Sequence, residues 1–345
     1  MLLQLFKQDI GIDLGTANTL IYVKGKGIIL NEPSVVAVDH QSKAVLATGK
    51  AAKDMIGRAP DSIDVVRPLE DGVISDFGMT QVMLREFIRR VIKNNMFTRI
   101  RIVVGVPSGV TEVEKRAVEE VARQMGAKEV YILDEPMAAA IGAGLLVDKA
   151  EGCMVADIGG GTSDIAIISL GGIVTSTSIR FAGDKMNDAI ITYMRKNYNI
   201  MVGLKSAEDA KIKIGCAWVD QDDPEFIRTY NIKGRDLISG LPRTVEINSL
   251  DIMKALEEPI NLIIDGIKST LEKAPPELSA DIIVTGLTLA GGGALLRGLD
   301  RLIEEQTGMK IIVSEDAIEA VAIGTGKSLE HIDRIQRYTH RNQKY

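Results

Sequence analysis

The sequence of 345 residues has few of the side chains on which many enzymes depend. It contains two cysteines and three histidines. Cys153 and Cys216 lie far apart and show neither metal-ligand spacing nor a disulfide framework, which suits a reducing cytoplasm. The histidines are equally scattered, so zinc sites and Ser-His-Asp or Cys-His catalysis have almost no residues available. Any reaction must therefore depend on carboxylates, hydroxyls and a metal ion.

An excess of positive charge and a long apolar segment are also missing. The net charge is -6 and the pI is near 5.4, so the chain has no basic footprint for nucleic acid, although a small nucleotide stays open as a ligand. The best apolar run, residues 136–147, is much shorter than the roughly 20 residues that span a bilayer. The first eight residues lack the basic start of a signal peptide. We expect a cytoplasmic protein that does not cross a membrane.

What the sequence does contain is a repeated glycine-rich hairpin. IGIDLGTANTLIYVKG (residues 10–25) and MVADIGGGTSDIAIISLGG (residues 154–172) each combine an apolar strand, an Asp, a Gly-rich turn with Thr and a second apolar strand. The two aspartates, Asp13 and Asp157, are about one domain length apart. A duplicated pair of domains, whose facing hairpins hold one ligand, is the economical interpretation.

Strands and helices alternate between the two hairpins. Residues 99–107 read as a buried strand, and residues 111–126 as an amphipathic helix that begins with a capping box of Thr111 and Glu114 and ends at Gly126. This order is typical of α/β architecture.

The second half repeats the arrangement. After its hairpin we expect a helix over residues 184–199, capped by Asp184, and later a strand over residues 280–293. Residues 217–250 carry turn signals between short β-type runs and indicate a small inserted subdomain, with residues 33–67 as its counterpart.

The repeated hairpins supply candidate ligands for a metal and a phosphate. Asp13 and Asp157 suit Mg²⁺, which prefers carboxylates, waters and phosphate oxygens, although either one alone could simply cap a turn. The glycines and threonines of the turns can offer N–H and hydroxyl donors to phosphate, and tight turns need glycine as well. A third glycine loop, residues 290–298, is suited to a flat base or a phosphate, or is a plain strand-to-helix turn.

Three further residues have both a functional and an ordinary structural interpretation. Glu135 precedes Pro136 at a helix start, where it can orient water for attack on a terminal phosphoryl group or simply complement the helix dipole. Glu208 and Lys211 share one helix face, where they can hold a ribose or form a solvated ion pair.

Apolar residues near the N-terminus and in a polar turn are candidates for contact with a bilayer surface, with core packing as the alternative. They are Leu2, Leu3, Leu5, Phe6, Met96 and Phe97.

Four segments together carry a resemblance that covers nearly the whole chain. IGIDLGTANTLIYVKGKGIILNEPSVVA, DEPMAAAIGAG, DIGGGTSDIA and GGGALLRGLDRLI, in that order, closely resemble the MreB family of bacterial actins. The resemblance implies an actin-like α/β fold of two domains, each with a small appended subdomain, closing on Mg²⁺ and ATP or ADP. It also implies slow ATP hydrolysis coupled to assembly of antiparallel double filaments. Such filaments bind the inner face of the cytoplasmic membrane and organise cell-wall synthesis, with the elongation machinery and its membrane-spanning adaptor as partners, to maintain rod shape.

The same resemblance divides the chain. Domain I is expected at residues 1–145 with a small subdomain at about 33–67, and domain II at residues 146–312 with a small subdomain at about 182–247. Residues 313–345 then form a C-terminal helix that returns to domain I and a polar tail.

Matching positions carry the family's residue roles. Asp13 and Asp157 correspond to carboxylates on the metal side that act through water, and Glu135, Thr162 and Asp157 to the catalytic set. Val113 lies on the helix that pairs protofilaments. The nucleotide contacts are expected at Asp13, Gly15, Thr16, Ala17, Asn18, Gly159, Gly160, Gly161, Thr162, Glu208, Lys211, Gly291, Gly292 and Gly293.

The sequence departs from the family pattern at two places. Ala290 stands where relatives usually carry Thr or Ser, which removes a hydroxyl near the nucleotide. GLKSAED replaces a more usual GERTAEE, which leaves Glu208 in register but changes its surroundings.

Three other ATPase classes with similar hairpins are the alternatives. A sugar-kinase-like phosphotransferase would need an aspartate base beside a sugar site, and a chaperone ATPase would need a peptide-binding domain. A plasmid-partitioning actin is the nearest competitor, and membrane affinity would distinguish it.

Overall fold

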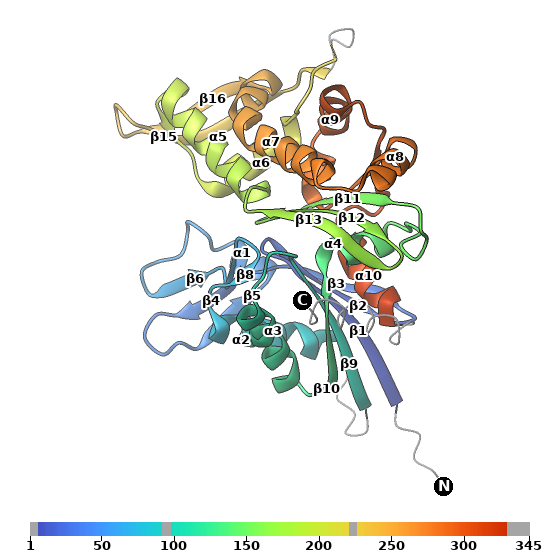
Figure 1. Cartoon of the computed structure of the whole chain (residues 1–345). Coiled ribbons are helices and arrows are strands. Elements are labelled where there is room, and N and C mark those ends of the chain that lie inside the picture. Colours follow the sequence, from blue (N-terminus) through green and yellow to red (C-terminus); the bar gives the residue numbers. More distant parts are fainter. Residues whose placement is uncertain (1–5, 92–97, 221–225, 330–345) are drawn as a thin grey trace.

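Two α/β lobes make up the computed structural model, which describes residues 6–91, 98–220 and 226–329 (Figure 1). The sheet of lobe I has the order β10-β9-β1-β2-β3, and that of lobe II has the order β13-β12-β11-β17-β18. The strands of lobe I are β1 (Phe6–Leu14), β2 (Asn18–Val23), β3 (Gly27–Pro33), β9 (Thr98–Val106) and β10 (Ala127–Asp134). Those of lobe II are β11 (Cys153–Ile158), β12 (Ser163–Ser169), β13 (Gly172–Ile179), β17 (Leu287–Ala290) and β18 (Ile311–Val313).

The two sheets have the same topology. In each, the first three strands form an antiparallel meander, and two later strands add in parallel beside the first. The predicted hairpins are confirmed as β1–β2 and β11–β12. Asp13 pairs with Leu20 in the first hairpin, and Asp157 pairs with Asp164 in the second.

Each lobe carries a small subdomain. In lobe I it contains the sheet β5-β4-β6 with a short helix, and in lobe II the sheet β14-β15-β16 with two helices. The lobe I elements are β4 (Val36–Asp39), β5 (Val45–Thr48), α1 (Lys50–Lys53) and β6 (Ile63–Val66), followed by the hairpin β7 (Leu69–Glu70) and β8 (Val73–Ile74). The lobe II elements are α5 (Gly183–Tyr198), β14 (Ile200–Met201), α6 (Leu204–Ile214), β15 (Thr229–Asp236) and β16 (Pro242–Asn248).

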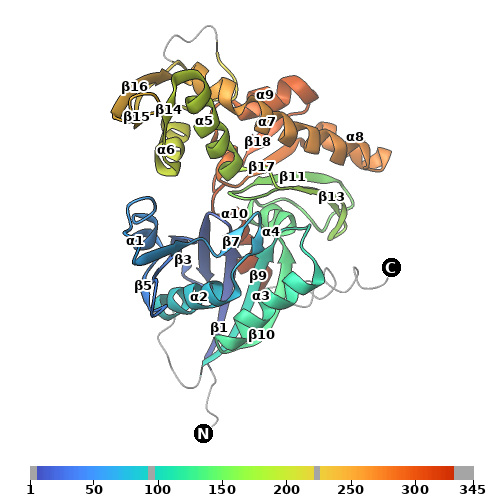
Figure 2. The ribbon, with the colours of Figure 1, turned by 90° about the vertical axis from the view of Figure 1, so that its left-hand side faces the viewer.

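Helices cover both faces of each sheet. One face of the lobe I sheet packs on α2 (Phe77–Val91) and α3 (Glu112–Gln124). Between the two sheets lie α4 (Glu135–Gly142) and α10 (Ala320–Ser328), which contribute to one apolar cluster with strands of both lobes (Figure 2). These two helices cross closely because glycines face backbone: a Cβ on Gly142 would lie 1.8 Å from the carbonyl oxygen of Ala320, and one on Gly324 would lie 1.8 Å from that of Ala138.

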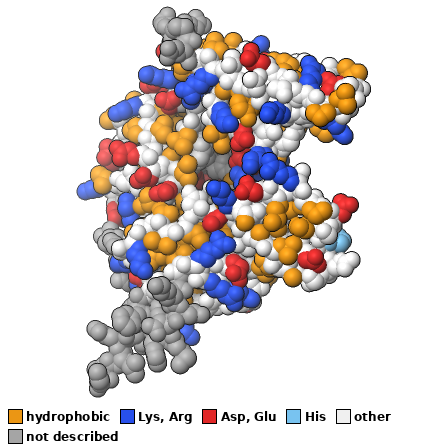
Figure 3. All heavy atoms as spheres, turned by 180° about the vertical axis from the view of Figure 1, so that it is seen from behind, with side chains coloured by type: hydrophobic (Ala, Val, Ile, Leu, Met, Phe, Trp, Pro, Cys, Tyr) orange, Lys and Arg blue, Asp and Glu red, His pale blue; other side chains and the backbone are white. Residues whose placement is uncertain are grey.

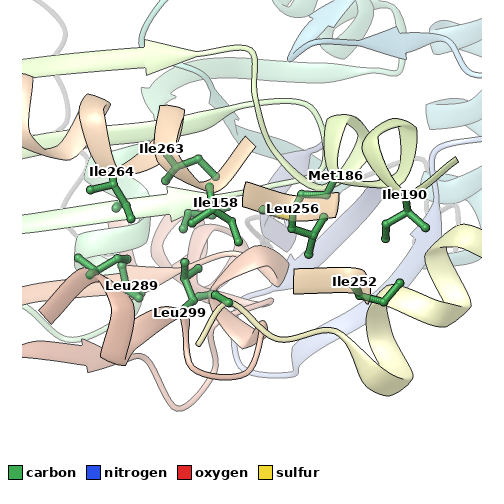
Figure 4. Packing of buried hydrophobic residues seen from close by; sticks show 14 of the residues in the cluster. Ile158, Met186, Ile190, Ile252, Leu256, Ile263, Ile264, Leu289 and Leu299 are labelled. Atoms are coloured by element: carbon green, nitrogen blue, oxygen red, sulfur yellow. The ribbon is translucent and has the colours of Figure 1, made fainter. Parts of the chain in front are cut away.

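The largest apolar cluster fills lobe II. Ile158 of β11 and Leu289 of β17 pack there against Ile263 and Ile264, with Met186 alongside (Figure 4). The helices on this outer face are α7 (Ser249–Glu272), α8 (Pro276–Thr285) and α9 (Leu299–Thr307). Because β11 is covered on both faces, its end is held rigidly at the junction of the lobes.

Two local predictions are wrong. The expected strand over residues 280–293 is helix as far as Thr285, the end of α8, which Pro276 begins, and only β17 is strand. Proline is well suited to the first turn of a helix, and Gly286, with φ near +80°, separates the two elements. Asp184 does not cap α5, whose N-cap is Ala182; its carboxylate binds Arg67 instead.

The predicted capping box is confirmed. Thr111 accepts a hydrogen bond from the backbone N–H of Glu114, and the Glu114 carboxylate accepts one from the N–H of Thr111. Over the described ranges, no helix combines the length and the apolar character needed to cross a membrane.

Candidate nucleotide site

A cavity of about 420 Å³ lies between the lobes. This volume is within the range typical of small-molecule sites. Every residue predicted to bind or act on a nucleotide lines it: Asp13, Gly15, Thr16, Ala17, Asn18, Glu135, Asp157, Gly159, Gly160, Gly161, Thr162, Glu208, Lys211, Gly291, Gly292 and Gly293. The fold therefore brings these positions together, and their individual roles stay predictions.

The tips of the two repeated hairpins touch at this cavity. A Cβ on Gly160 would lie 2.5 Å from the Cβ of Ala17, and one on Gly161 would lie 2.5 Å from the Thr16 hydroxyl oxygen. That hydroxyl also accepts a hydrogen bond of 3.0 Å from the backbone N–H of Gly72, in the turn between β7 and β8. Glycine is thus required in the second tip because any larger residue would force the hairpins apart.

The aspartates of the two hairpins are held in an environment that disfavours their charge. Burial raises the pKa of Asp13 to about 7, and burial together with the charges of Asp13 and Asp164 raises the pKa of Asp157 well above its ordinary value. Asp157 is only 6% exposed, whereas Asp13 keeps part of its surface open at the cavity. A cation in the cavity would relieve this cost and favour both carboxylates in their ionised form.

Glu135 is the first residue of α4 and lines the same cavity. Burial raises its pKa well above the ordinary value, with added contributions from the carboxylates of Asp164, Asp13 and Asp157. The N-terminus of α4 carries a partial positive charge, which favours the Glu135 carboxylate. This agrees with the alternative interpretation, in which Glu135 simply complements the helix dipole. The same position leaves the side chain able to orient a water molecule within the cavity.

Asp164 is a residue that the sequence interpretation missed. It lies opposite Asp157 in the β11–β12 hairpin and is 1% exposed. Its Oδ1 atom accepts hydrogen bonds from the backbone N–H (3.0 Å) and the hydroxyl (3.1 Å) of Ser108, which follows β9 in lobe I. Its Oδ2 atom is buried without a hydrogen-bond partner among the described residues. The register of the hairpin, whose turn of residues 159–162 sets residues 157 and 164 opposite each other, is the signal that could have found it.

Glu208 and Lys211 of α6 do not form the solvated ion pair that was the alternative interpretation. Glu208 binds Lys53 of lobe I at 3.0 Å, and the Lys211 ammonium donates a hydrogen bond of 2.7 Å to the carbonyl of Gly183. Burial lowers the pKa of Lys211. Both side chains line the cavity, and Lys211 contacts the start of α5.

The third glycine loop forms another wall of the cavity and begins beside the Asp157 carboxylate. Gly291 has a φ of +79°, and a Cβ there would lie 2.3 Å from the carbonyl oxygen of Ile158, so only glycine fits. The neighbouring lining includes Met186, Ile212, Leu295, Leu296 and Ile318. Ala290, which precedes the loop, is fully buried and does not line the cavity. The apolar side chains of this lining suit the faces of a flat ring.

Two other groups of predicted residues lie away from the cavity. Val113 of α3 is 77% exposed, as a contact between filaments would require, and its role in pairing stays a prediction. Five of the six predicted membrane residues lie outside the described residues: Leu2, Leu3, Leu5, Met96 and Phe97. Of the sixth, Phe6, only the backbone is described.

Comparison with known sequences gives a consistent result. The family model described as MreB/Mbl protein matches residues 7–337. The chain is 50% identical over 334 residues to the cell shape-determining protein MreB of Escherichia coli (strain K12), covering 95% of each chain. It is 48% identical over 333 residues to the cell shape-determining protein Mbl of Bacillus subtilis (strain 168), covering 96% of this chain and 99% of that protein.

Solved structures agree with the sequence comparison. MreB5 of Spiroplasma citri bound to ADP matches with a TM-score of 0.90 and 40% identity, over 96% of this chain and 98% of that one. The MamK double helical filament matches with a TM-score of 0.80 at 20% identity, over 94% of this chain and 99% of that one, a likeness that concerns the fold alone. The predicted actin-like fold is confirmed, and the chain belongs to the MreB/Mbl family.

Proposed function

We propose that this chain is a cytoskeletal protein of rod-shaped cells that assembles into filaments with ATP bound and hydrolyses it slowly. The observation that carries the proposal is the meeting of two acidic, glycine-rich hairpins, one from each lobe, at a single cavity. The names of the relatives as cell shape-determining proteins support the cellular role. MreB5 structures bound to ADP and to AMPPNP support the ligand class.

Phosphate would be held by the hairpin tips. The backbone N–H groups of residues 15–18 and 159–162, with the hydroxyls of Thr16 and Thr162, can surround an anion at the point where the lobes meet. The apolar part of the lining would take the base, and Glu208 with Lys211 would stand near the ribose. The cavity thus offers a polar part for phosphate and an apolar part for the base.

Magnesium fits the acidic end of this cavity. Asp13 and Asp157 are buried carboxylates whose charges are not compensated by a neighbouring cation in the described chain. Within the described ranges, no group of three or more His, Cys, Asp or Glu side chains could hold a metal. An ion held by two carboxylates, waters and phosphate oxygens matches the preference of Mg²⁺, which would neutralise phosphate charge.

Glu135 and Thr162 would orient the attacking water. The carboxylate and the hydroxyl both line the cavity on the side of the hairpin tips, where they can fix a water in line with the β–γ phosphate bond. Attack forms a bond from the water oxygen to the γ-phosphorus and breaks the bond to the bridging oxygen. Few groups besides these take part, which is consistent with slow turnover.

Sedimentation tests the assembly. Protein with Mg-ATP should pellet as filaments, and Asp157→Ala should remove the dependence on nucleotide. Glu135→Ala should still bind ATP but release phosphate more slowly, by about 10²-fold if its share is that of a typical positioned acid–base group. An unchanged rate of phosphate release would remove Glu135 from its assigned role.

We also propose that the filaments pair through α3 and lie on the inner face of the cytoplasmic membrane, where they guide the wall-elongation machinery. The exposed Val113 supports the pairing. Val113→Glu should leave single protofilaments in electron micrographs. Deleting residues 2–6 and replacing Met96 and Phe97 should abolish binding to vesicles of anionic lipid, and unchanged binding would reject these residues as the attachment site. No vesicle binding by the unmodified protein would favour a plasmid-partitioning role.

A further inference from the structure

Two partly buried ion pairs join the lobes at the mouth of the cavity. Lys53 of α1 binds Glu208 of α6 at 3.0 Å, and Arg67, just after β6, binds Asp184 at the start of α5 at 2.6 Å. In each pair lobe I supplies the cation and lobe II the anion. Basic and acidic side chains gather at the inner end of the notch between the two lobes (Figure 3).

The two acidic residues are tied to the glycine-rich hairpin of lobe II. The backbone N–H of Asp184 donates a hydrogen bond of 2.8 Å to the carbonyl of Gly160, and that of Gly183 donates one of 3.1 Å to the carbonyl of Gly159. Lys211, one turn beyond Glu208 in α6, donates to the carbonyl of Gly183. A force on Asp184 is therefore passed directly to the residues that would contact phosphate, and a force on Glu208 is passed to them through α6 and Lys211.

The two basic residues belong to a small subdomain that is joined to the core of its lobe through one strand. Val36 and Val38 of β4 pack in the main core of lobe I, whereas the other face of the small sheet covers a separate cluster. All four charged side chains of the two pairs are 25–35% exposed, so water reaches them only in part. Their attraction is consequently stronger than that of a fully exposed pair, yet salt still weakens it.

We propose that Lys53 is a positioning residue of the nucleotide site, and that the pairs Lys53–Glu208 and Arg67–Asp184 form a cleft latch that must open before a nucleoside triphosphate can enter or leave. The proposal rests on the proposed function in naming the ligand. Lys53 fixes the Glu208 carboxylate at the cavity wall, and Arg67 fixes the start of α5. Opening the latch frees the small subdomain of lobe I to swing away from α5 and α6.

Nucleotide kinetics test the latch. We would measure association and release of a fluorescent N-methylanthraniloyl ATP, with Mg²⁺, at 50 and 300 mM KCl for Lys53→Met and Arg67→Met. Each variant should speed both association and release by about two- to five-fold at low salt, because each removes one partly exposed pair. The release rate of the unmodified protein should rise with salt, and this dependence should flatten in the variants.

Lys43→Met is the matched control. Lys43 binds Asp64 at 2.9 Å within the same small subdomain of lobe I, so the variant removes a lysine and an ion pair without touching the cleft. It should leave both rates unchanged. General damage to the site would slow association while it speeds release. Rates equal to those of the unmodified protein in Lys53→Met and Arg67→Met would overturn the latch.

Exchanging the charges gives a stricter test. Arg67→Glu should speed release more than Arg67→Met, because two carboxylates then face each other. Adding Asp184→Lys restores an attractive pair in the opposite sense and should return the release rate most of the way. Failure of the double variant to slow release below that of Arg67→Glu would count against a direct pair.

A distance measurement separates failure of the latch from failure of the proposed function. Spin labels at Gln41→Cys and Ile238→Cys, both on exposed residues of the two small subdomains, report the opening of the notch without nucleotide. The native cysteines, Cys153 and Cys216, are buried. The distance distribution should broaden towards longer values in Lys53→Met. If the protein binds no nucleotide but shows this broadening, the function is wrong and the latch stands; an unchanged distribution would overturn the latch itself.

Discussion

The two small subdomains differ in how they are joined to their lobes. In lobe II, Ile200, Ile232 and Ile247 of the sheet β14-β15-β16 belong to the same apolar cluster as the main sheet and α7. In lobe I, only Val36 and Val38 of β4 reach the main core, and the other face of the sheet β5-β4-β6 surrounds a small cluster of its own. The main sheets repeat one topology, yet the small subdomain of lobe II shares its lobe's core through all three strands and that of lobe I through one strand.

This difference in shared core indicates which small subdomain moves more easily. A unit with few buried contacts to its neighbours can open locally at low free energy, whereas a unit that shares the main core opens only with the whole lobe. Because the small subdomain of lobe I shares less of its core with the main sheet, we expect it to be the part that moves when the cleft opens. The hairpin of lobe II, with β11 and β12 buried along their whole length, is the fixed part against which it closes.

The largest effect is expected from a cavity in the shared core. Ile232→Ala removes a fully buried side chain from lobe II and should lower the free energy of unfolding by about 2–5 kcal/mol. Ile63→Ala, the counterpart in the small subdomain of lobe I, removes a partly buried side chain and should cost less than about 1.5 kcal/mol. Denaturant melts report the global change. Hydrogen exchange should show that Ile63→Ala loosens only residues of its own subdomain, and equal global losses would contradict the comparison.

A second prediction concerns the buried carboxylates of the two hairpins. The pKa of Asp13 rises from 3.8 to about 7 on folding, so without a cation the folded protein binds this proton more tightly than the unfolded chain. Stability from this group is complete below about pH 4 and is lost as the pH rises to about 7. Asp13→Asn should then raise the free energy of unfolding at pH 8, in EDTA, by about 2–4 kcal/mol, and should flatten its dependence on pH.

The measurement for Asp13→Asn is a series of thermal melts between pH 5 and 8. Mg-ATP should stabilise the unmodified protein and should leave the variant unchanged, because the variant lacks the carboxylate that a cation needs. Asp157→Asn, in the fixed hairpin, is the parallel variant and should behave in the same way. A variant less stable than the unmodified protein at pH 8 would show that the carboxylate is compensated within the chain.

A smaller effect is expected where the two lobes meet at the base of the cleft. Ser108→Ala removes one hydroxyl donor to Asp164 and leaves the backbone N–H of Ser108 in place. Leaving a buried carboxylate short of donors costs about 1–3 kcal/mol. Asp164→Asn keeps the acceptor oxygen and removes the charge, so it should lose less stability. Urea melts compare them, and a larger loss in Asp164→Asn would mean that its charge is compensated in the folded state.

Short-range sequence patterns predicted the helices and strands, but they did not predict which residues far apart in the sequence pair with each other. The hairpins, the capping box and the helix at Pro136 each depend on residues a few positions apart, so the sequence alone indicated them. The error at residues 280–293 arose because an apolar run with β-branched residues reads as strand, while Pro276 and the packing of Ile282 favour helix. Propensity is a weak prior that tertiary packing overrides.

The residues that line the cavity were predicted more completely than the ion pairs at its mouth. The lining residues were identified because glycine turns and aspartates recur in two copies of one motif. Arg67 and Asp184 are 117 positions apart, and Lys53 and Glu208 are 155 apart. A lysine or arginine on a small subdomain reads as an ordinary solvated charge, and nothing in its neighbours identifies its partner. Only the closure of one lobe on the other brings these charges together.

The smallest effect concerns a third pair across the cleft. Lys205 of α6 lies 3.4 Å from Asp54, which follows α1, and the two side chains are 49% and 55% exposed. Exposed pairs contribute about 0–1 kcal/mol, and physiological salt screens them further. Lys205→Met should therefore change the release rate of the fluorescent ATP by less than about two-fold, against two- to five-fold for Lys53→Met. The comparison uses the same kind of substitution on neighbouring pairs. If Lys205→Met speeds release as much as Lys53→Met does, any charge across the notch would suffice, and closure would depend on the net attraction between the small subdomains rather than on two partly buried pairs.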